Sequence, residues 1–157
     1  MAMPVHLSTK RLRRRSVAPA RVRRAAERML ESLDMIDAEL SILLCDDATI
    51  QELNRDFRAK DRPTDVLAFA MREGEGGGLH PELLGDVVIS VETARAAALL
   101  GGRPIAQEVI HLLAHGLLHL LGHDHRDEAE ERRMRAMTEA LVAASSPRRG
   151  LPIAERS

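Results

Sequence analysis

The hydrophobic positions of this chain follow two spacings, one typical of strands and one typical of helices. Short apolar runs predict four strands, at 4–8 (an edge strand), 38–45, 66–71 and 83–90. Apolar residues that recur every three or four positions predict helices, at 19–33, 49–58, 91–102, from Pro104 onward, and at 127–144. This order predicts an α+β fold, a single domain with a small, about four-stranded mixed sheet packed with helices.

Two signals mark the start of the helix predicted at 49–58. Thr49 and Glu52 have the spacing of a capping box. Just before them, Asp46 and Asp47 form a pair of carboxylates that can serve acid–base chemistry or can cap the helix. Because Asp is common where a strand turns into a helix, we favour the structural interpretation of this pair.

The composition limits the class of protein. A chain of 157 residues with 45% hydrophobic and 30% charged residues is ordinary for a soluble globular protein. We expect one domain over 1–146 and a disordered tail over 147–157.

No apolar run reaches the length of a membrane span, so no membrane partner is expected. The single cysteine, Cys45, excludes a disulfide scaffold and is predicted to lie in the core. No signal-peptide pattern is visible, so we expect a cytoplasmic protein.

The net charge of −1 hides an uneven distribution along the chain. The first 30 residues hold nine Lys or Arg and one Glu, a local charge of +8, which leaves −9 for the remainder. Such a basic end can bind nucleic acid through its phosphates. It can equally be a solvated helix face, or an Arg-rich transit peptide if residues 5–33 lie outside the fold.

Five of the seven histidines fall within the stretch HLLAHGLLHLLGHDH, residues 111–125. His115 and His119 are four residues apart, so they lie on one face of a helix and can share a metal ion. His111 is about 12 Å along the helix axis from His119. It cannot join both on one ion, because zinc binds nitrogen at about 2.1 Å. A third ligand must therefore come from beyond the helix.

Gly122 lets the chain leave the helix, so that His123 or His125 can approach the same ion. The spacing His-x-x-x-His-x-x-Gly-x-x-His is the ligand spacing of metzincin proteases, and it selects His125. Three neutral imidazoles leave a fourth position for water, which is typical of a catalytic site. We therefore predict one Zn²⁺, or another divalent ion, bound by His115, His119 and His125.

Position 116 is glycine, where zincin proteases carry the glutamate that acts as general base. Since glycine can neither accept nor donate a side-chain proton, the pattern favours a hydrolytic metal site but disfavours a protease. His111 and His123 stay open between three interpretations, which are a hydrogen bond beside the ligands, a contact to substrate, and a purely structural role.

Three segments together resemble the YbeY family of bacterial metal-dependent endoribonucleases. They are LNRDFRAKDRPTDVLAF (53–69), LLGDVVIS (83–90) and HGLLHLLGHDH (115–125), which occur in the family's order and cover about the central half of the chain. The resemblance implies an α+β fold, a zinc-type metal on the three histidines and cleavage of single-stranded RNA. It further implies a role in maturation of the 16S rRNA 3′ end and in ribosome quality control. Ribosomal or small-subunit proteins are then the implied partners, and DNA is not.

The resemblance also places Arg58 at the family's functionally important arginine, so that Arg58 is implied to be catalytic and to bind substrate. A guanidinium fork suits a phosphate, and Lys60 adds a second cation as a substrate-binding candidate. A cation opposite the metal would stabilise the negative charge that accumulates on the phosphoryl oxygens. The competing interpretation is that Arg58 ends a helix and interacts with its dipole. Family members often have tyrosine where this chain has Phe57.

The remaining polar and aromatic residues leave several questions open. Phe57 and Phe69 are the only aromatics, so we expect little base stacking and RNA binding that depends mainly on phosphates. Asp61, Thr64 and Asp65 can order the turn around Pro63 or shape the site, and no residue is identifiable as general base. Two alternative functions are kept, a metal-stabilised ribosome-assembly or RNA-binding factor without catalysis and another kind of metallohydrolase.

Overall fold

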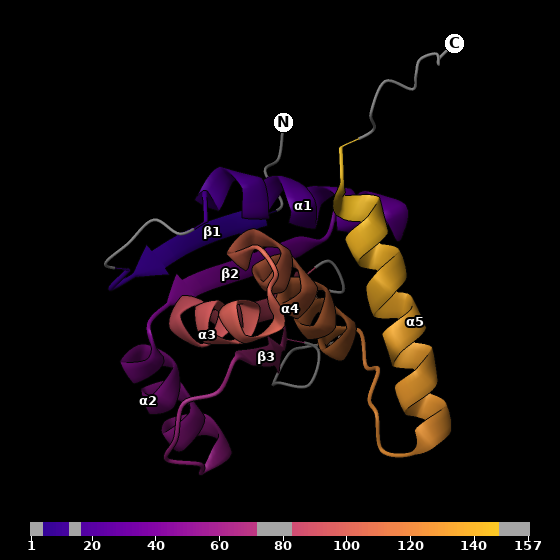
Figure 1. The fold of residues 1–157 in the computed structure, drawn as a ribbon. Helices are drawn as coiled ribbons and strands as arrows, with labels where there is room; N and C mark the ends of the chain where they lie inside the picture. Colours follow the sequence, from indigo (N-terminus) through magenta and orange to yellow (C-terminus); the bar gives the residue numbers. More distant parts are fainter. Residues whose placement is uncertain (1–4, 13–16, 72–82, 148–157) are drawn as a thin grey trace.

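The computed structural model describes residues 5–12, 17–71 and 83–147 (Figure 1). The loop predicted at 72–82 and nearly all of the tail predicted at 147–157 lie outside these residues. Four strands form one mixed sheet in the order β1-β2-β4-β3, in which β1, β2 and β4 are parallel and β3 is antiparallel to β4. The strands are β1 (Val5–Lys10), β2 (Glu39–Cys45), β3 (Val66–Ala70) and β4 (Leu83–Ser90). The four predicted strands and the mixed sheet are confirmed.

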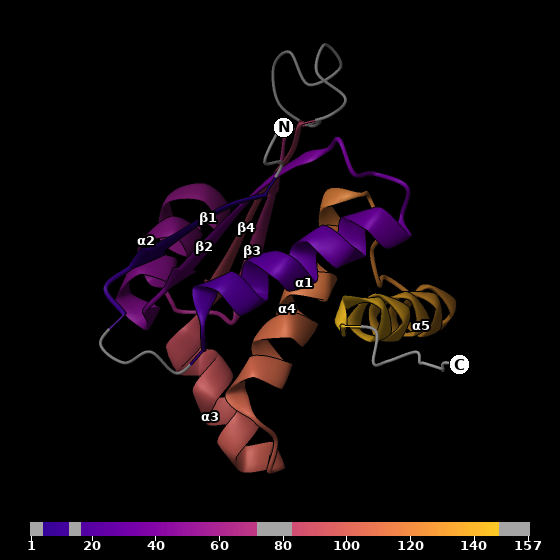
Figure 2. The same cartoon turned by 90° about the horizontal axis from the view of Figure 1, so that it is seen from above.

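Five helices complete the described part of the fold, and all five were predicted. They are α1 (Pro19–Ser32), α2 (Asp47–Arg58), α3 (Val91–Gly101), α4 (Ile105–Leu120) and α5 (Glu128–Ser145). Helices α1 and α4 cover one face of the sheet, and α5 packs outside them (Figure 2). Helix α2 lies on the opposite face. No helix within the described ranges is long and apolar enough to cross a membrane.

The two faces of the sheet bury two separate hydrophobic cores. Leu40, Ile42 and Leu44 alternate along β2 and point into the larger core, under α1 and α4. The smaller core lies under α2 and consists of Cys45, Ile50, Leu67 and Val88. The prediction that Cys45 is a core residue is confirmed, and burial followed by the neighbouring Asp46 and Asp47 raises the pKa of its thiol to about 12.

The start of α2 differs from the predicted capping box. Asp46 is the N-cap, and its carboxylate accepts a hydrogen bond from the backbone N–H of Thr49 at 2.9 Å. The prediction that Thr49 caps the helix is therefore wrong, because Asp46 satisfies that N–H and starts the helix two residues earlier. The structural interpretation of the acidic pair is confirmed, since Asp47 accepts from the hydroxyl of Thr93 at 2.6 Å.

A β-bulge in β4 requires the glycine of the LLGDVVIS segment. The pairing of β2 with β4 shifts register after Glu39, so that Leu40 pairs with Gly85 and Leu84 has no partner in β2. Gly85 has a φ of 135°, and a Cβ placed there would lie 2.1 Å from the carbonyl oxygen of Phe69 in β3. The absence of a side chain at Gly85 thus allows β3 to pair closely with β4 at this edge of the sheet.

Candidate metal centre

Helix α4 carries two of the histidines along the border of the larger core. Leu113 and Leu117 point into that core and are fully buried. His115 and His119 lie on another face of the same helix and are half-buried, and their Nε2 atoms are 3.1 Å apart. The four-residue spacing therefore brings both imidazoles to one place, as the sequence predicted.

Gly116 lies where α4 packs tightly against β3 and β4. A Cβ placed at Gly116 would be 2.7 Å from Cγ1 of Val87 in β4 and 3.3 Å from Cγ2 of Val66 in β3. Any side chain at this position would have to push the helix away from the two strands. At the position that carries the catalytic glutamate in zincin proteases, a side chain would start toward the packed strands, although the glycine itself lines the pocket beside His115 and His119.

The turn after α4 brings the third histidine back to the helix. Gly122 has a φ of 95°, a left-handed conformation that favours glycine, and the N–H of His123 donates to the carbonyl of Leu118 at 3.0 Å. The chain then reverses, and the ring of His125 lies 5.8 Å from that of His115 and 5.6 Å from that of His119.

These three histidines can hold a metal ion. One ring nitrogen from each residue lies within 4.8 Å of the other two. Two nitrogens bound to the same tetrahedral zinc are expected about 3.3 Å apart, close to the 3.1 Å between His115 and His119. No other group of three or more His, Cys, Asp or Glu within the described ranges has ligand atoms this close together. The donor set fits zinc or a similar divalent ion, because it consists of imidazoles alone.

The surroundings keep the imidazoles in the form that binds metals. Burial, together with the neighbouring His119 and His125, lowers the pKa of His115 to about 4, although Asp65 acts in the opposite direction. Burial is also the main cause of the lowered pKa of His119. Both rings are therefore neutral near pH 7, with a lone pair free for a metal.

A pocket of about 360 Å³ between α4 and β3 joins these histidines to Arg58. Arg58 is the last residue of α2, and its guanidinium reaches the edge strand, where it donates to the carbonyl of Ala68 at 2.7 Å. The guanidinium also lies over the ring of Phe69, 4.8 Å from its centroid. Arg58, His115 and His119 all line the pocket, as do Gly116 and residues of β3. The structure thus brings Arg58 to the histidines from the far face of the sheet.

Asp61 and Asp65, which the sequence analysis grouped as possible turn or site residues, lie in different places in the structure. Asp65 lines the pocket, and its carboxylate accepts from the N–H of Val66 at 2.7 Å. Asp61 instead accepts from the side chain of Gln51 at 3.0 Å, on the exposed side of α2. Lys60 is exposed and is not among the residues that line the pocket with Arg58.

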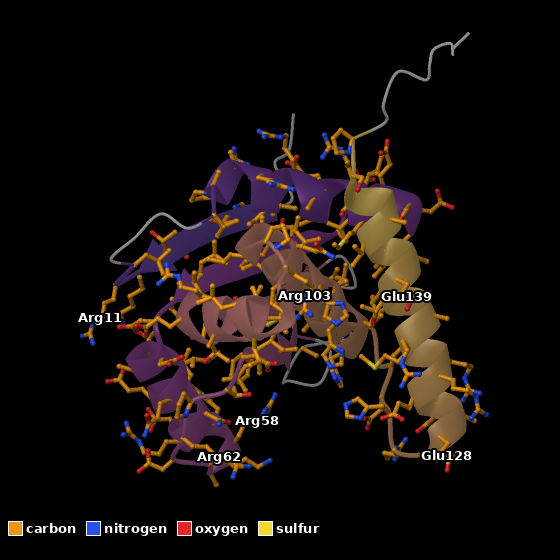
Figure 3. All side chains as sticks on the ribbon, in the orientation of Figure 1. Arg11, Arg58, Arg62, Arg103, Glu128 and Glu139 are labelled. Carbon is orange, nitrogen blue, oxygen red and sulfur yellow. The ribbon has the colours of Figure 1, made fainter. Side chains whose placement is uncertain are left out.

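A second pocket, of about 400 Å³, lies on the other side of the histidines, between α4 and α5. His115 and His125 line it together with His111, so His111 is close to the site without being part of the three-histidine cluster. Helix α5 contributes the rest of the lining, which is Glu131, Met134, Arg135, Thr138 and Glu139. Figure 3 shows Arg58 and Glu139 on opposite sides of α4.

His123 points to a different part of the surface. It lines a small cavity with Arg126, Glu130 and Arg133 at the start of α5, and this cavity does not include the three clustered histidines. The sequence did not indicate that α5 borders the site, because its charged residues have the ordinary spacing of a solvated helix face.

The comparisons with known proteins point to one family. Residues 8–146 match the family model described as Endoribonuclease YbeY. A protein named Endoribonuclease YbeY from Syntrophotalea carbinolica is 45% identical over 141 residues, which cover 88% of this chain and 93% of that protein. One of the same name from Geobacter metallireducens is 46% identical over 135 residues, covering 85% of this chain and 90% of that protein.

A solved structure shares the fold. The solution structure of TM1509 from Thermotoga maritima aligns with a TM-score of 0.62 and covers 90% of this chain and 88% of that one. At 21% sequence identity, this similarity shows the arrangement of helices and strands and nothing about chemistry.

Proposed function

The chain belongs to the YbeY endoribonuclease family, and from this we propose that it cleaves single-stranded RNA with the help of a divalent metal. The observation that carries the proposal is the pocket in which Arg58 and two of the three clustered histidines line one cavity. We further propose the cellular task that the family resemblance implies, maturation of the 16S rRNA 3′ end and ribosome quality control in the cytoplasm. RNA and small-subunit ribosomal proteins are then the partners.

His115, His119 and His125 would hold the ion, which we propose to be Zn²⁺. Support comes from the all-imidazole donor set and from the lowered pKa values of His115 and His119, which leave their rings neutral. When bound, such an ion supplies a Lewis acid that withdraws electron density from a phosphoryl oxygen or from water. Gly116, the position after the first ligand, packs closely against Val87 and Val66 and also lines the pocket with Arg58, but it offers no side-chain group for proton transfer.

Arg58 is proposed to bind the scissile phosphate. One of its terminal nitrogens is engaged by the carbonyl of Ala68, and this bond together with the ring of Phe69 fixes the plane of the guanidinium. The N–H groups that remain can donate to phosphoryl oxygens, which gain negative charge as the phosphodiester is cleaved. Because the guanidinium is already held, little conformational freedom is lost when substrate binds. Lys60, two residues later, is proposed to contact a neighbouring phosphate.

The proposal is tested by cleavage of a fluorescently labelled single-stranded RNA. Wild type, His115→Ala, Arg58→Ala and Arg132→Ala are purified identically and assayed with chelator and after zinc is added back. Arg132 is a matched control, because it is an exposed arginine on α5, paired only weakly with Glu128 at 4.0 Å. We expect chelator-sensitive cleavage by wild type and Arg132→Ala, at least about 100-fold slower cleavage by Arg58→Ala, and none by His115→Ala.

Equal cleavage by wild type and folded His115→Ala would contradict the proposal. If no variant cleaves RNA but all bind it equally, the protein is instead an RNA-binding assembly factor. Circular dichroism and thermal unfolding of each variant show whether a loss of activity reflects a loss of fold.

A further inference from the structure

The two phenylalanines of the chain, its only aromatic residues other than histidine, lie against each other beside Arg58. Phe57 in α2 and Phe69 in β3 have ring centroids 5.5 Å apart at an interplanar angle of 67°, an edge-to-face contact. Phe69 packs against the smaller core, but the side chain of Phe57 is 64% exposed. A large aromatic ring is thus presented to solvent at the edge of the sheet.

The location of Phe57 distinguishes it from an ordinary exposed apolar residue, which by itself would need no explanation. Phe57 directly precedes Arg58, and the guanidinium of Arg58 lies over the ring of Phe69, the same ring that Phe57 contacts. The two rings and the guanidinium therefore form one assembly. This assembly continues into the pocket of the histidines, since Arg58 lines that pocket.

We propose that Phe57 is a stacking site for an unpaired nucleobase, the base next to the phosphate that Arg58 binds. This inference rests on the proposed endoribonuclease function. Every nucleobase presents a flat π-surface, and an exposed aromatic ring beside a phosphate-binding cation is how proteins bind single-stranded nucleic acid without reading its sequence. The contact with Phe69 supports the ring of Phe57 from one side and leaves most of it free for a base.

Such a site would contribute to the preference for single strands. In a duplex the bases are stacked on each other and paired, so none can lie on Phe57 unless it is first unstacked. From composition we expected little base stacking, because the chain has only two phenylalanines. Composition could not show that both lie together beside Arg58. Both are used at one point, beside the residue that is proposed to bind the scissile phosphate.

Binding is measured by fluorescence anisotropy with a labelled, fully 2′-O-methylated 10-nucleotide RNA, whose integrity is checked on a gel. Phe57→Ala should weaken binding by about 5-fold or more, and Phe57→Tyr should restore it, because stacking needs the aromatic face. Ile36→Ala is the matched control, since Ile36 is 61% exposed and lies in the loop between α1 and β2. It should bind like wild type.

Salt dependence separates stacking from phosphate binding. Arg58→Ala should reduce the slope of log affinity against log salt by about one, because one phosphate contact is lost. Phe57→Ala should leave that slope unchanged while lowering the affinity at every salt concentration. A change of slope in Phe57→Ala would mean that the variant has disturbed Arg58, and the assigned stacking role would be wrong.

A scan with abasic nucleotides locates the base. One abasic position in the RNA should weaken binding to wild type as much as Phe57→Ala does, and it should cost nothing further in that variant. If Phe57→Ala binds within twofold of wild type, or if each abasic position costs the same in both proteins, the stacking site is refuted. Chelator-sensitive cleavage that depends on His115 would still stand in that case, so the two proposals fail separately.

Discussion

Gly116 illustrates how a single position combines packing with chemistry. A Cβ at this position would overlap Val87 and Val66, so glycine allows α4 to pack close to the strands. His115 and His119 then lie at the pocket between α4 and β3. A glutamate here would point into the sheet. Charged groups of other elements lie beside the three histidines, with Arg58 and Asp65 in the pocket next to β3 and Glu131, Arg135 and Glu139 in the pocket next to α5.

Replacing Gly116 tests this packing argument. Alanine is about 1 kcal/mol better than glycine in a helix interior, so Gly116→Ala would stabilise an unconstrained helix. We expect the opposite, a free energy of unfolding lower by about 1–2 kcal/mol, because the new Cβ overlaps a stiff β-branched valine. Urea denaturation measures the difference. A variant as stable as wild type would show that α4 can move away from the sheet without cost.

At the scale of the secondary-structure elements, helix ends place the functional groups. The start of α2 is set by Asp46, and its last residue is Arg58. The end of α4 is set by Gly122, which directs the chain back so that His125 meets the helix. Substitutions at Asp46 should therefore mainly change stability, and substitutions at Gly122 should mainly change metal affinity. Two sets of variants test this.

The cap of α2 should stabilise the protein in a pH-dependent way. Partial burial raises the pKa of Asp46, but the hydrogen bonds from Thr49 outweigh it, and the pKa lies below its ordinary value of 3.8. The cap therefore stabilises the fold fully above that value, and its contribution is lost as pH falls through the lower pKa of the folded state. Asp46→Ala should cost about 1 kcal/mol at pH 7 and less at pH 3.

The control for this prediction is Asp46→Asn, which keeps a side-chain acceptor without a titrating group. Its unfolding free energy relative to Asp46→Ala should change little with pH, as measured by urea titrations at both values. An Asp46→Ala deficit that grows as the pH falls would contradict the proposed role of the carboxylate.

The turn after α4 should matter more for metal binding than for stability. Gly122→Ala has room for its Cβ but must hold a φ of 95°, which costs about 1–2 kcal/mol, and relaxing that strain moves His125. We expect zinc affinity, measured by competition with a chromophoric chelator, to fall about 10-fold or more. Gly102→Ala, at the end of α3 with a φ of 66° and an equally open Cβ, should lose similar stability but no zinc affinity.

At the scale of the whole molecule, the site joins the two faces of the sheet. Helix α4 brings two histidines on one face and α2 brings Arg58 from the other, and they meet at the edge strand β3. Helix α5 lies on the far side of α4 from the sheet (Figure 2), and its residues line the second pocket together with His115 and His125. An ion held by all three histidines would bind the folded state preferentially, because His125 approaches His115 and His119 only through the turn after α4.

Metal removal should therefore lower the thermal stability of the whole chain. An ion that binds only the folded state at about 100 times its Kd adds about 2.7 kcal/mol, or about 5–10 °C in Tm for a chain of this size. We expect chelation to remove that increment and zinc to restore it, as followed by circular dichroism. His115→Ala should show neither effect. A zinc-dependent Tm in folded His115→Ala would place the ion elsewhere.

The sequence predicted those parts of the site that depend on local geometry. The i,i+4 spacing of His115 and His119 and the glycine before His125 act within fifteen residues, so the cluster follows from the helix and its turn. The choice between Asp46 and Thr49 as N-cap was missed, because both residues are good caps and only the backbone path after β2 distinguishes them.

The parts that depend on distant pairing could not be predicted in the same way. The approach of Arg58 to the histidines requires β3 to lie at the sheet edge beside α4, and no spacing along the chain encodes that arrangement. The same holds for the contact between Phe57 and Phe69 and for the wall that Glu139 and its neighbours form. Composition gave the number of aromatics but not that both would gather beside one arginine.

Because the two cores differ in size, we expect the helices that cover them to differ in their free energy of local unfolding. The smaller core contains only four buried residues, so α2 can detach at a lower free energy than global unfolding requires, and its amides should exchange with deuterium sooner than those of α4. In such a partly open molecule the proposed metal site on α4 and its turn would stay intact, whereas Arg58, at the end of α2, would leave the pocket. If Arg58 binds the scissile phosphate as proposed, this open form would retain metal but would not cleave RNA, so activity would depend on the packing of α2 against the sheet.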